Sequence, residues 1–95
     1  MLKGKMKTLR NASYKELEIG QTIYNFEECG LDQSYIISPM TLDGFSVNKN
    51  GIYAFNASNE HYTCTNSSSL DKYYLSLDEL VEFCKENDIP YSISN

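Results

Sequence analysis

The sequence predicts a single α+β domain, in which a small antiparallel sheet or partly closed barrel of about five strands precedes one C-terminal helix. Three observations predict this class. The chain has 95 residues, the size of one domain. Short runs rich in β-branched and aromatic residues follow one another, separated by turn residues, over most of the chain. A single amphipathic helical pattern comes last, and strands in succession before a helix indicate an antiparallel sheet.

We expect one domain over residues 1–95, with a basic N-terminal arm at 1–11, a mainly β region at 12–75, a helix at 76–87 and a tail at 88–95. The net charge is −5, but the first ten residues contain four basic and no acidic side chains, so the other 85 carry −5 − 4 = −9. An arm with so few charges is typical of a solvated terminus. The acidic body repels phosphate, and we therefore expect no direct binding of nucleic acid.

The first half of the chain contains one helical turn and two strands. Ser13 stands three residues before Glu16, which is the spacing of a capping box. Residues 21–28, QTIYNFEE, alternate as a strand with one aromatic face. A second strand is expected at 35–38 and ends before Pro39, because proline has no N–H to donate to a ladder.

An Asn-Gly pair between two β-rich runs predicts a hairpin over 44–55. Two registers compete. A two-residue turn would place Phe45 opposite a polar side chain, whereas a three-residue loop with its glycine left-handed pairs Phe45 with Phe55 and Val47 with Tyr53. We favour the second register because it gathers four large apolar groups on one face, and aromatic cross-strand pairs contribute roughly 0.2–1 kcal/mol each.

Two more short strands, HYTC at 61–64 and KYYL at 72–75, lead to the final helix. Ser76 and Glu79 have the spacing of a capping box at its start. Apolar residues then recur at i, i+3, i+4 and i+7, which predicts one buried stripe: Leu77, Leu80, Val81 and Cys84. Acidic residues follow the opposite side of the helix: Asp78, Glu82 and Glu86.

Two segments carry a resemblance to known proteins. Gly20, Ile23 and Tyr24 resemble the first strand of small SH3-like barrels, in which a glycine precedes an aromatic-bearing strand. The run from Leu75 to Leu80 is similar to the strand-to-helix ending of many small proteins of phages and mobile elements of Gram-positive bacteria. The resemblance covers about a fifth of the chain and implies an SH3-like fold and a phage setting. It transfers no catalytic residue.

The residues that could carry chemistry are one histidine and three cysteines. His61 and Cys64 are an odd number of residues apart on a predicted strand, so their side chains point to opposite faces. Adding Cys29 and Cys84 gives the ligand count of a zinc site, but without the close cysteine pairing typical of structural zinc. Glycine-rich phosphate loops and hydrolase motifs are absent from the sequence. We therefore expect no enzymatic activity, no cofactor and no metal.

Binding to another molecule is the remaining expectation. Tyrosines beside acidic groups are typical of protein-binding surfaces, and we expect one of two consecutive tyrosines on a strand to be exposed. The predicted binding residues are Asp78, Glu82, Glu86, Tyr62, Tyr73 and Tyr74. The expected partner is a basic host protein such as a defence nuclease, which the chain would inhibit or modulate as anti-CRISPR proteins do. The alternative is a nucleotide-capture module with a tyrosine-lined pocket or dimer interface.

The sequence also indicates where in the cell the protein is located and whether it associates with a second copy. The first residues lack the apolar core of a signal peptide, and no run approaches the length of a membrane span. The cysteines are odd in number and widely spaced, which fits a reducing compartment. We therefore expect a cytoplasmic protein, in the host cell if phage-encoded, without membrane contact. A homodimer is also proposed, since edge strands and a small core would both gain from a second copy.

Overall fold

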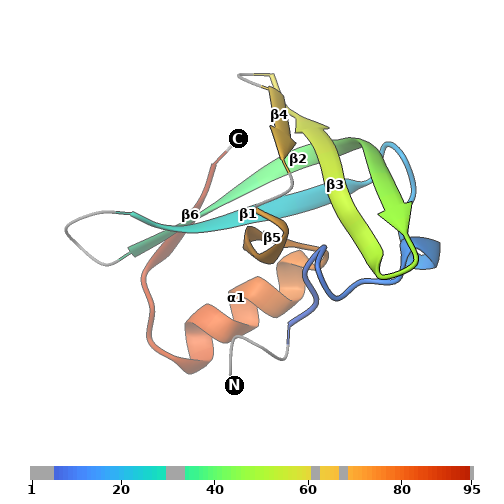
Figure 1. The fold of residues 1–95 in the computed structure, drawn as a ribbon. Coiled ribbons are helices and arrows are strands. Elements are labelled where there is room, and N and C mark those ends of the chain that lie inside the picture. The colour runs from blue at the N-terminus through green and yellow to red at the C-terminus, as the bar shows by residue number, and fades with distance from the viewer. Residues whose placement is uncertain (1–5, 30–33, 61–62, 67–68, 95) are drawn as a thin grey trace.

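The computed structural model describes residues 6–29, 34–60, 63–66 and 69–94 (Figure 1). The chain forms a sheet that is covered on one side by a helix near the C-terminus. In chain order the elements are η2 (Tyr14–Glu16), β1 (Thr22–Cys29), β2 (Ser34–Asn48), β3 (Gly51–Ser58), β4 (Thr63–Asn66), η4 (Leu70–Lys72), β5 (Tyr73–Tyr74), α1 (Leu77–Glu86) and β6 (Tyr91–Ile93).

Five strands form an antiparallel sheet in the order β4-β3-β2-β1-β5, which does not close into a barrel. The sixth strand, β6, runs parallel to β2 and pairs with its first half. Together with α1, this confirms the α+β class and the open alternative of the predicted architecture. The parallel strand was not predicted, because residues 88–95 are too few and too polar to show a strand pattern of their own.

The 15 residues of β2 serve two hairpins. Its first half pairs with β1 from Cys29↔Ser34 to Thr22↔Thr41, and its second half pairs with β3. Register shifts between Leu42 and Gly44 and between Ser46 and Val47 interrupt the second ladder. Such bulges bend a strand and increase its twist. As a result β2 arches from one hairpin into the other (Figure 1).

The prediction that a strand ends before Pro39 is wrong, because Pro39 lies inside β2. Tyr35 and Ile37 direct their backbone groups to the β6 side, where Tyr35 N–H donates to Pro90 and Ile37 C=O accepts from Ser94. Pro39, two residues further on, faces the same way. It falls between the end of the β6 ladder at Ile37 and the start of the β3 ladder at Thr41, so its missing N–H breaks no pair.

The hairpin between β2 and β3 agrees with the prediction in part. Phe45 pairs with Phe55, as predicted, and Gly51 has a positive φ of 117°. The predicted three-residue loop is wrong, because Gly51 pairs with Asn48 and leaves a loop of two residues, Lys49 and Asn50. Val47 pairs with Ile52 and not with Tyr53, because a bulge adds one residue to β3. The bulge lets Ile52 and Phe55 both point into the core, and it turns Tyr53 outward, where 49% of its surface is exposed. The predicted apolar face of Phe45, Val47, Tyr53 and Phe55 therefore loses Tyr53.

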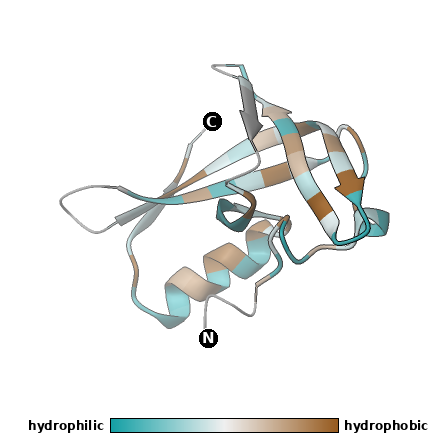
Figure 2. Cartoon of the chain, viewed as in Figure 1, coloured by the Kyte–Doolittle hydropathy of each residue, from teal (hydrophilic) through white to brown (hydrophobic). Residues whose placement is uncertain are grey.

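Apolar side chains cover both faces of the sheet in two clusters, and polar and apolar bands alternate along the strands (Figure 2). The inner cluster lies within the curve of the sheet, and the helix cluster lies between the sheet and α1. The buried residues of the inner cluster are Leu9, Ala12, Leu17, Ile23, Met40, Leu42, Ile52, Phe55, Ala57, Leu70 and Tyr73. Those of the helix cluster are Met6, Phe26, Ile37, Tyr74, Leu80, Phe83 and Cys84.

The N-terminal segment is part of the core, which corrects the expected solvated arm over residues 6–9. Met6 enters the helix cluster and Leu9 the inner cluster. Leu9 N–H donates to Tyr73 C=O at 3.0 Å, so the segment runs beside β5. The side chains of Lys7 and Arg10 are exposed, and Arg10 Nε lies 2.6 Å from Asp71 Oδ1. The arm was misinterpreted because Met6 and Leu9 stand among basic residues in the sequence.

The predicted helical features are confirmed in part, since Ser76 and Glu79 form only one half of the expected capping box. Ser76 is the N-cap of α1, and its Oγ accepts from the N–H of Glu79 at 3.3 Å. Of the four residues predicted to form the buried stripe, Leu80 and Cys84 are fully buried, whereas Leu77 and Val81 are half-buried. Earlier in the chain, Ser13 and Glu16 form the expected capping box around η2.

Candidate functional site

The outer side of α1 carries a row of carboxylates. Asp78, Glu82 and Glu86 are all exposed and follow one another four residues apart, as the sequence predicts. Glu79 is half-buried and Asp88 is exposed at the end of the helix. Residues 77–88 thus contain five carboxylates and a single basic side chain, Lys85, for a net charge of 1 − 5 = −4. We call Asp78, Glu82 and Glu86 the acidic row.

The two consecutive tyrosines of β5 do not contribute to a surface. Tyr73 is 4% exposed and Tyr74 is 3% exposed, so the prediction that one of them is exposed is wrong. The reason is that both faces of the sheet are covered at β5. The Tyr73 ring packs against Phe55 at 4.8 Å in the inner cluster, and the Tyr74 ring packs against Phe26 at 5.7 Å in the helix cluster. Tyr62 lies outside the described residues.

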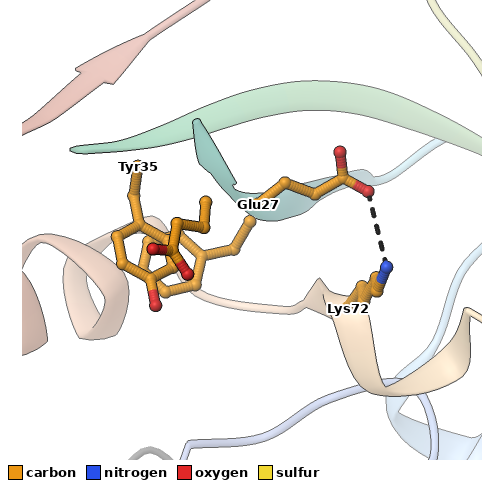
Figure 3. Close-up of a pocket in the computed structure, with 5 residues that line it drawn as sticks. Glu27, Tyr35 and Lys72 are labelled. Carbon is orange, nitrogen blue, oxygen red and sulfur yellow. Dashed lines mark ion pairs between the residues drawn. The ribbon is translucent and has the colours of Figure 1, made fainter. Parts of the chain in front are cut away.

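A hollow of about 360 Å³ opens at the far end of β1 (Figure 3). The Tyr35 ring stacks on Phe26 with a centroid distance of 4.5 Å and an interplanar angle of 17°. Glu28 stands directly opposite Tyr35 in the β1–β2 ladder, so the two side chains leave the sheet on the same face. Glu27 leaves on the other face, where Lys72 Nζ lies 3.9 Å from its Oε1. The lining residues are Phe26, Glu27, Glu28, Tyr35 and Lys72.

The chemistry of this hollow suits a cation. An aromatic ring attracts a guanidinium or ammonium group through its quadrupole, and a neighbouring carboxylate adds a charge-assisted hydrogen bond. Two carboxylates against one lysine disfavour a phosphate group. In the sequence, Glu27 and Glu28 stand at the end of the strand predicted over residues 21–28. The aromatic floor was not predicted, because it depends on the register that brings Tyr35 beside Phe26.

A second hollow of about 320 Å³ lies beside the β2–β3 hairpin. The outward-turned Tyr53 and the buried Ile52 form one wall, and Arg10 borders it. Because Arg10 is already held by Asp71 at 2.6 Å, the hollow presents a mainly neutral lining. Its residues are Arg10, Asn48, Asn50, Ile52, Tyr53 and Leu70. The described part of its lining contains no carboxylate, histidine, cysteine or serine, the side chains that most often serve as a catalytic base or nucleophile.

The cysteine and histidine expectations can be compared with the structure only at Cys84. Burial raises the pKa of the Cys84 thiol, so little thiolate is present to act as a nucleophile. His61 and the side chains of Cys29 and Cys64 lie outside the described part of the chain. Within that part, no group of three or more His, Cys, Asp or Glu residues could hold a metal ion.

Of the predicted binding residues, the structure therefore gathers the three carboxylates on one surface and buries the two tyrosines in the core. Aromatic surface is supplied instead by Tyr14 and Tyr53, which are exposed, and by the half-buried Tyr35. No helix in the described ranges is both long and apolar enough to cross a membrane. No protein-family model, curated protein or solved structure matches the chain.

Proposed function

We propose that this chain is a small, non-enzymatic, acidic binding protein that docks through α1 on a basic surface of another protein. The acidic row carries the proposal, because its three carboxylates are exposed and lie on a helix whose other side is buried. A packed helix holds its charges at fixed positions. Opposite charge on a partner would speed encounter and fix the orientation of the complex.

The proposed setting is a phage or mobile element, and the proposed effect is to inhibit or modulate a basic host protein such as a defence nuclease. This setting is supported by the resemblance of Leu75–Leu80 and by the small size and acidic charge of the chain. A nuclease needs a basic surface to hold phosphates. A rigid row of carboxylates is complementary to such a surface, whereas it repels the nucleic acid itself.

Nucleotide capture is the second candidate function. It is supported by the stacked rings of Tyr35 and Phe26, which border a hollow of about 360 Å³. The carboxylates of Glu27 and Glu28 oppose the phosphate groups that such a ligand would bring. A thermal-shift series with nucleotides tests this candidate, since a ligand that binds only the folded state raises Tm with its concentration.

The test of the main proposal compares two charge-matched triple variants. The chain is used to capture partners from a bacterial lysate at low salt, and the binding of an identified partner is then measured. Asp78→Asn, Glu82→Gln and Glu86→Gln remove the acidic row. Three other exposed carboxylates give a control with the same change in charge: Glu18→Gln, Asp43→Asn and Glu60→Gln.

We expect the acidic-row variant to lose at least about tenfold in affinity, equivalent to 1.4 kcal/mol, and the control to lose much less. Raising the salt concentration should weaken the wild-type complex, because exposed charges are screened. Equal losses in the two variants would show that only net charge matters and would reject α1 as the docking surface.

A further inference from the structure

The first strand of the sheet is longer than its outer neighbour. The ladder between β1 and β5 ends at Asn25↔Tyr73, because the chain before Tyr73 turns into η4. β1 continues to Cys29 and stays paired with β2 on its other side. Among the described residues, no strand pairs with the outer edge of β1 beyond Asn25. Figure 1 shows this end of the β1–β2 hairpin projecting beyond β5.

The backbone of Glu28 faces this outer edge. Its cross-strand partner Tyr35 donates its N–H to Pro90 at 2.9 Å, on the β6 side of β2 and away from β1. In an antiparallel ladder, residues directly opposite either bond to each other or both point away from each other. Glu28↔Tyr35 is therefore a non-hydrogen-bonded pair. The N–H and C=O of Glu28 point away from β2, where an added strand would meet them.

The hollow described above lies at the same edge. Glu28 and Tyr35 line it on one face of the sheet, and Lys72 borders it where η4 leaves the edge (Figure 3). A backbone edge beside a side-chain hollow is the arrangement by which sheets accept an extended peptide. Main-chain hydrogen bonds then supply affinity, and the hollow selects a side chain.

We propose that an extended segment of a partner protein adds as a strand to the outer edge of β1 at Glu27–Cys29 and places a lysine or arginine in the hollow, against the Tyr35 ring and the Glu28 carboxylate. This inference rests on the proposed binding function and names a second contact for the partner, apart from the acidic row.

The charges at the edge favour a different chain over a second copy of this one. Antiparallel self-pairing about Glu27 would place this residue opposite its own copy, and like charges directly opposite are destabilising. Charged residues on an edge strand are a recognised protection against self-association. A basic strand instead gains from both Glu27 and Glu28, which are exposed.

The test uses two short synthetic peptides with the uniformly ¹⁵N-labelled chain. One peptide alternates valine and threonine around a central lysine. The other keeps the same lysine but has proline at the positions that would donate hydrogen bonds, so it carries the charge and cannot pair as a strand. We expect only the first to shift the amides of Glu27–Cys29 and Tyr35 and to slow hydrogen exchange at Glu28.

Two variants of the chain separate this proposal from the main one. Glu28→Lys should weaken binding of the first peptide by at least about tenfold, and Glu18→Lys, also exposed, should not. The acidic-row variant should bind the peptide as wild type does. The proposal is overturned by equal binding of both peptides, by shifts confined to α1, or by no shift up to about 1 mM peptide. Concentration-dependent protection of Glu28 without peptide would replace it with a homodimer at this edge.

Discussion

The Tyr74 hydroxyl illustrates how burial sets the chemistry of a single residue. Burial, followed by electrostatic repulsion from Asp71 and Tyr35, raises the pKa of Tyr74 to about 12. In the unfolded chain this hydroxyl has its ordinary pKa of 10.0. Between these two pH values the unfolded state has released the proton and the folded state still holds it. The contribution of Tyr74 to stability is therefore complete below pH 10.0 and is lost as the pH rises toward 12.

We predict that the free energy of unfolding falls as the pH rises from 10.0 to about 12, and that Tyr74→Phe makes this fall shallower. Urea denaturation at a series of pH values measures it. Tyr14→Phe is the control, because the Tyr14 side chain is 50% exposed. If both variants followed the wild-type curve, the burial of the Tyr74 hydroxyl could not be the cause of the alkaline loss.

At the scale of the element, the β2–β3 hairpin depends on one glycine. Gly51 follows the two-residue loop with a φ of 117°, which side chains rarely allow. A Cβ built there would meet nothing within 4 Å, so a substitution would cost backbone strain only. Asn48 supports the same turn, because its Oδ1 accepts from the N–H of Asn50 at 2.8 Å.

We predict that Gly51→Ala lowers the free energy of unfolding by about 1–3 kcal/mol. Gly44→Ala, in the same hairpin, is the control. Its added Cβ would lie 3.7 Å from Asn56 Nδ2, an ordinary contact, and its φ is not in the positive range, so we expect a change within about 0.5 kcal/mol. Urea denaturation of both variants measures the difference. Similar losses of stability in the two variants would show that replacing either glycine costs this much, and that the positive φ of Gly51 is not the cause.

Elements specified by neighbouring residues could be predicted, and those specified by distant ones could not. The cap at Ser76, the buried stripe through Leu80 and Cys84, and the capping box at Ser13 each depend on residues within one or two turns. The length of β2 depends on where two other strands stop, and β6 exists because β2 offers it an edge. The bulge that exposes Tyr53 likewise depends on how the core fills.

The same distinction applies to the candidate site. Helical periodicity alone indicated that Asp78, Glu82 and Glu86 share the exposed side of α1. The hollow at the end of β1 requires the β1–β2 register, the early end of β5 and the stacking of Tyr35 on Phe26. None of these is visible in a single stretch of sequence. The tyrosines of β5 were misplaced for a related reason, since the sheet is covered on both faces.

For the molecule as a whole, three strands contribute to both clusters: β1, β2 and β5. β1 contributes Ile23 to the inner cluster and Phe26 to the helix cluster, and β5 contributes Tyr73 to one and Tyr74 to the other. The N-terminal segment also reaches both. A small domain buries a limited fraction of its surface, so neither cluster has a large reserve of stability. Loss of one cluster would displace strands on which the other depends.

We therefore predict that the clusters unfold together in one transition. Ile23→Val in the inner cluster and Ile37→Val in the helix cluster are mild variants, each expected to cost about 0.5–1.5 kcal/mol without unfolding the chain. Methyl NMR signals of Leu42 and Leu80, followed through a urea titration, report on the inner and helix clusters respectively. Each variant should lower the midpoint of both signals equally, because β1, β2 and β5 each contribute side chains to both clusters. A shift of the Leu80 signal alone in Ile37→Val would show that α1 unfolds separately, and a rigid acidic row on the helix would then have no support.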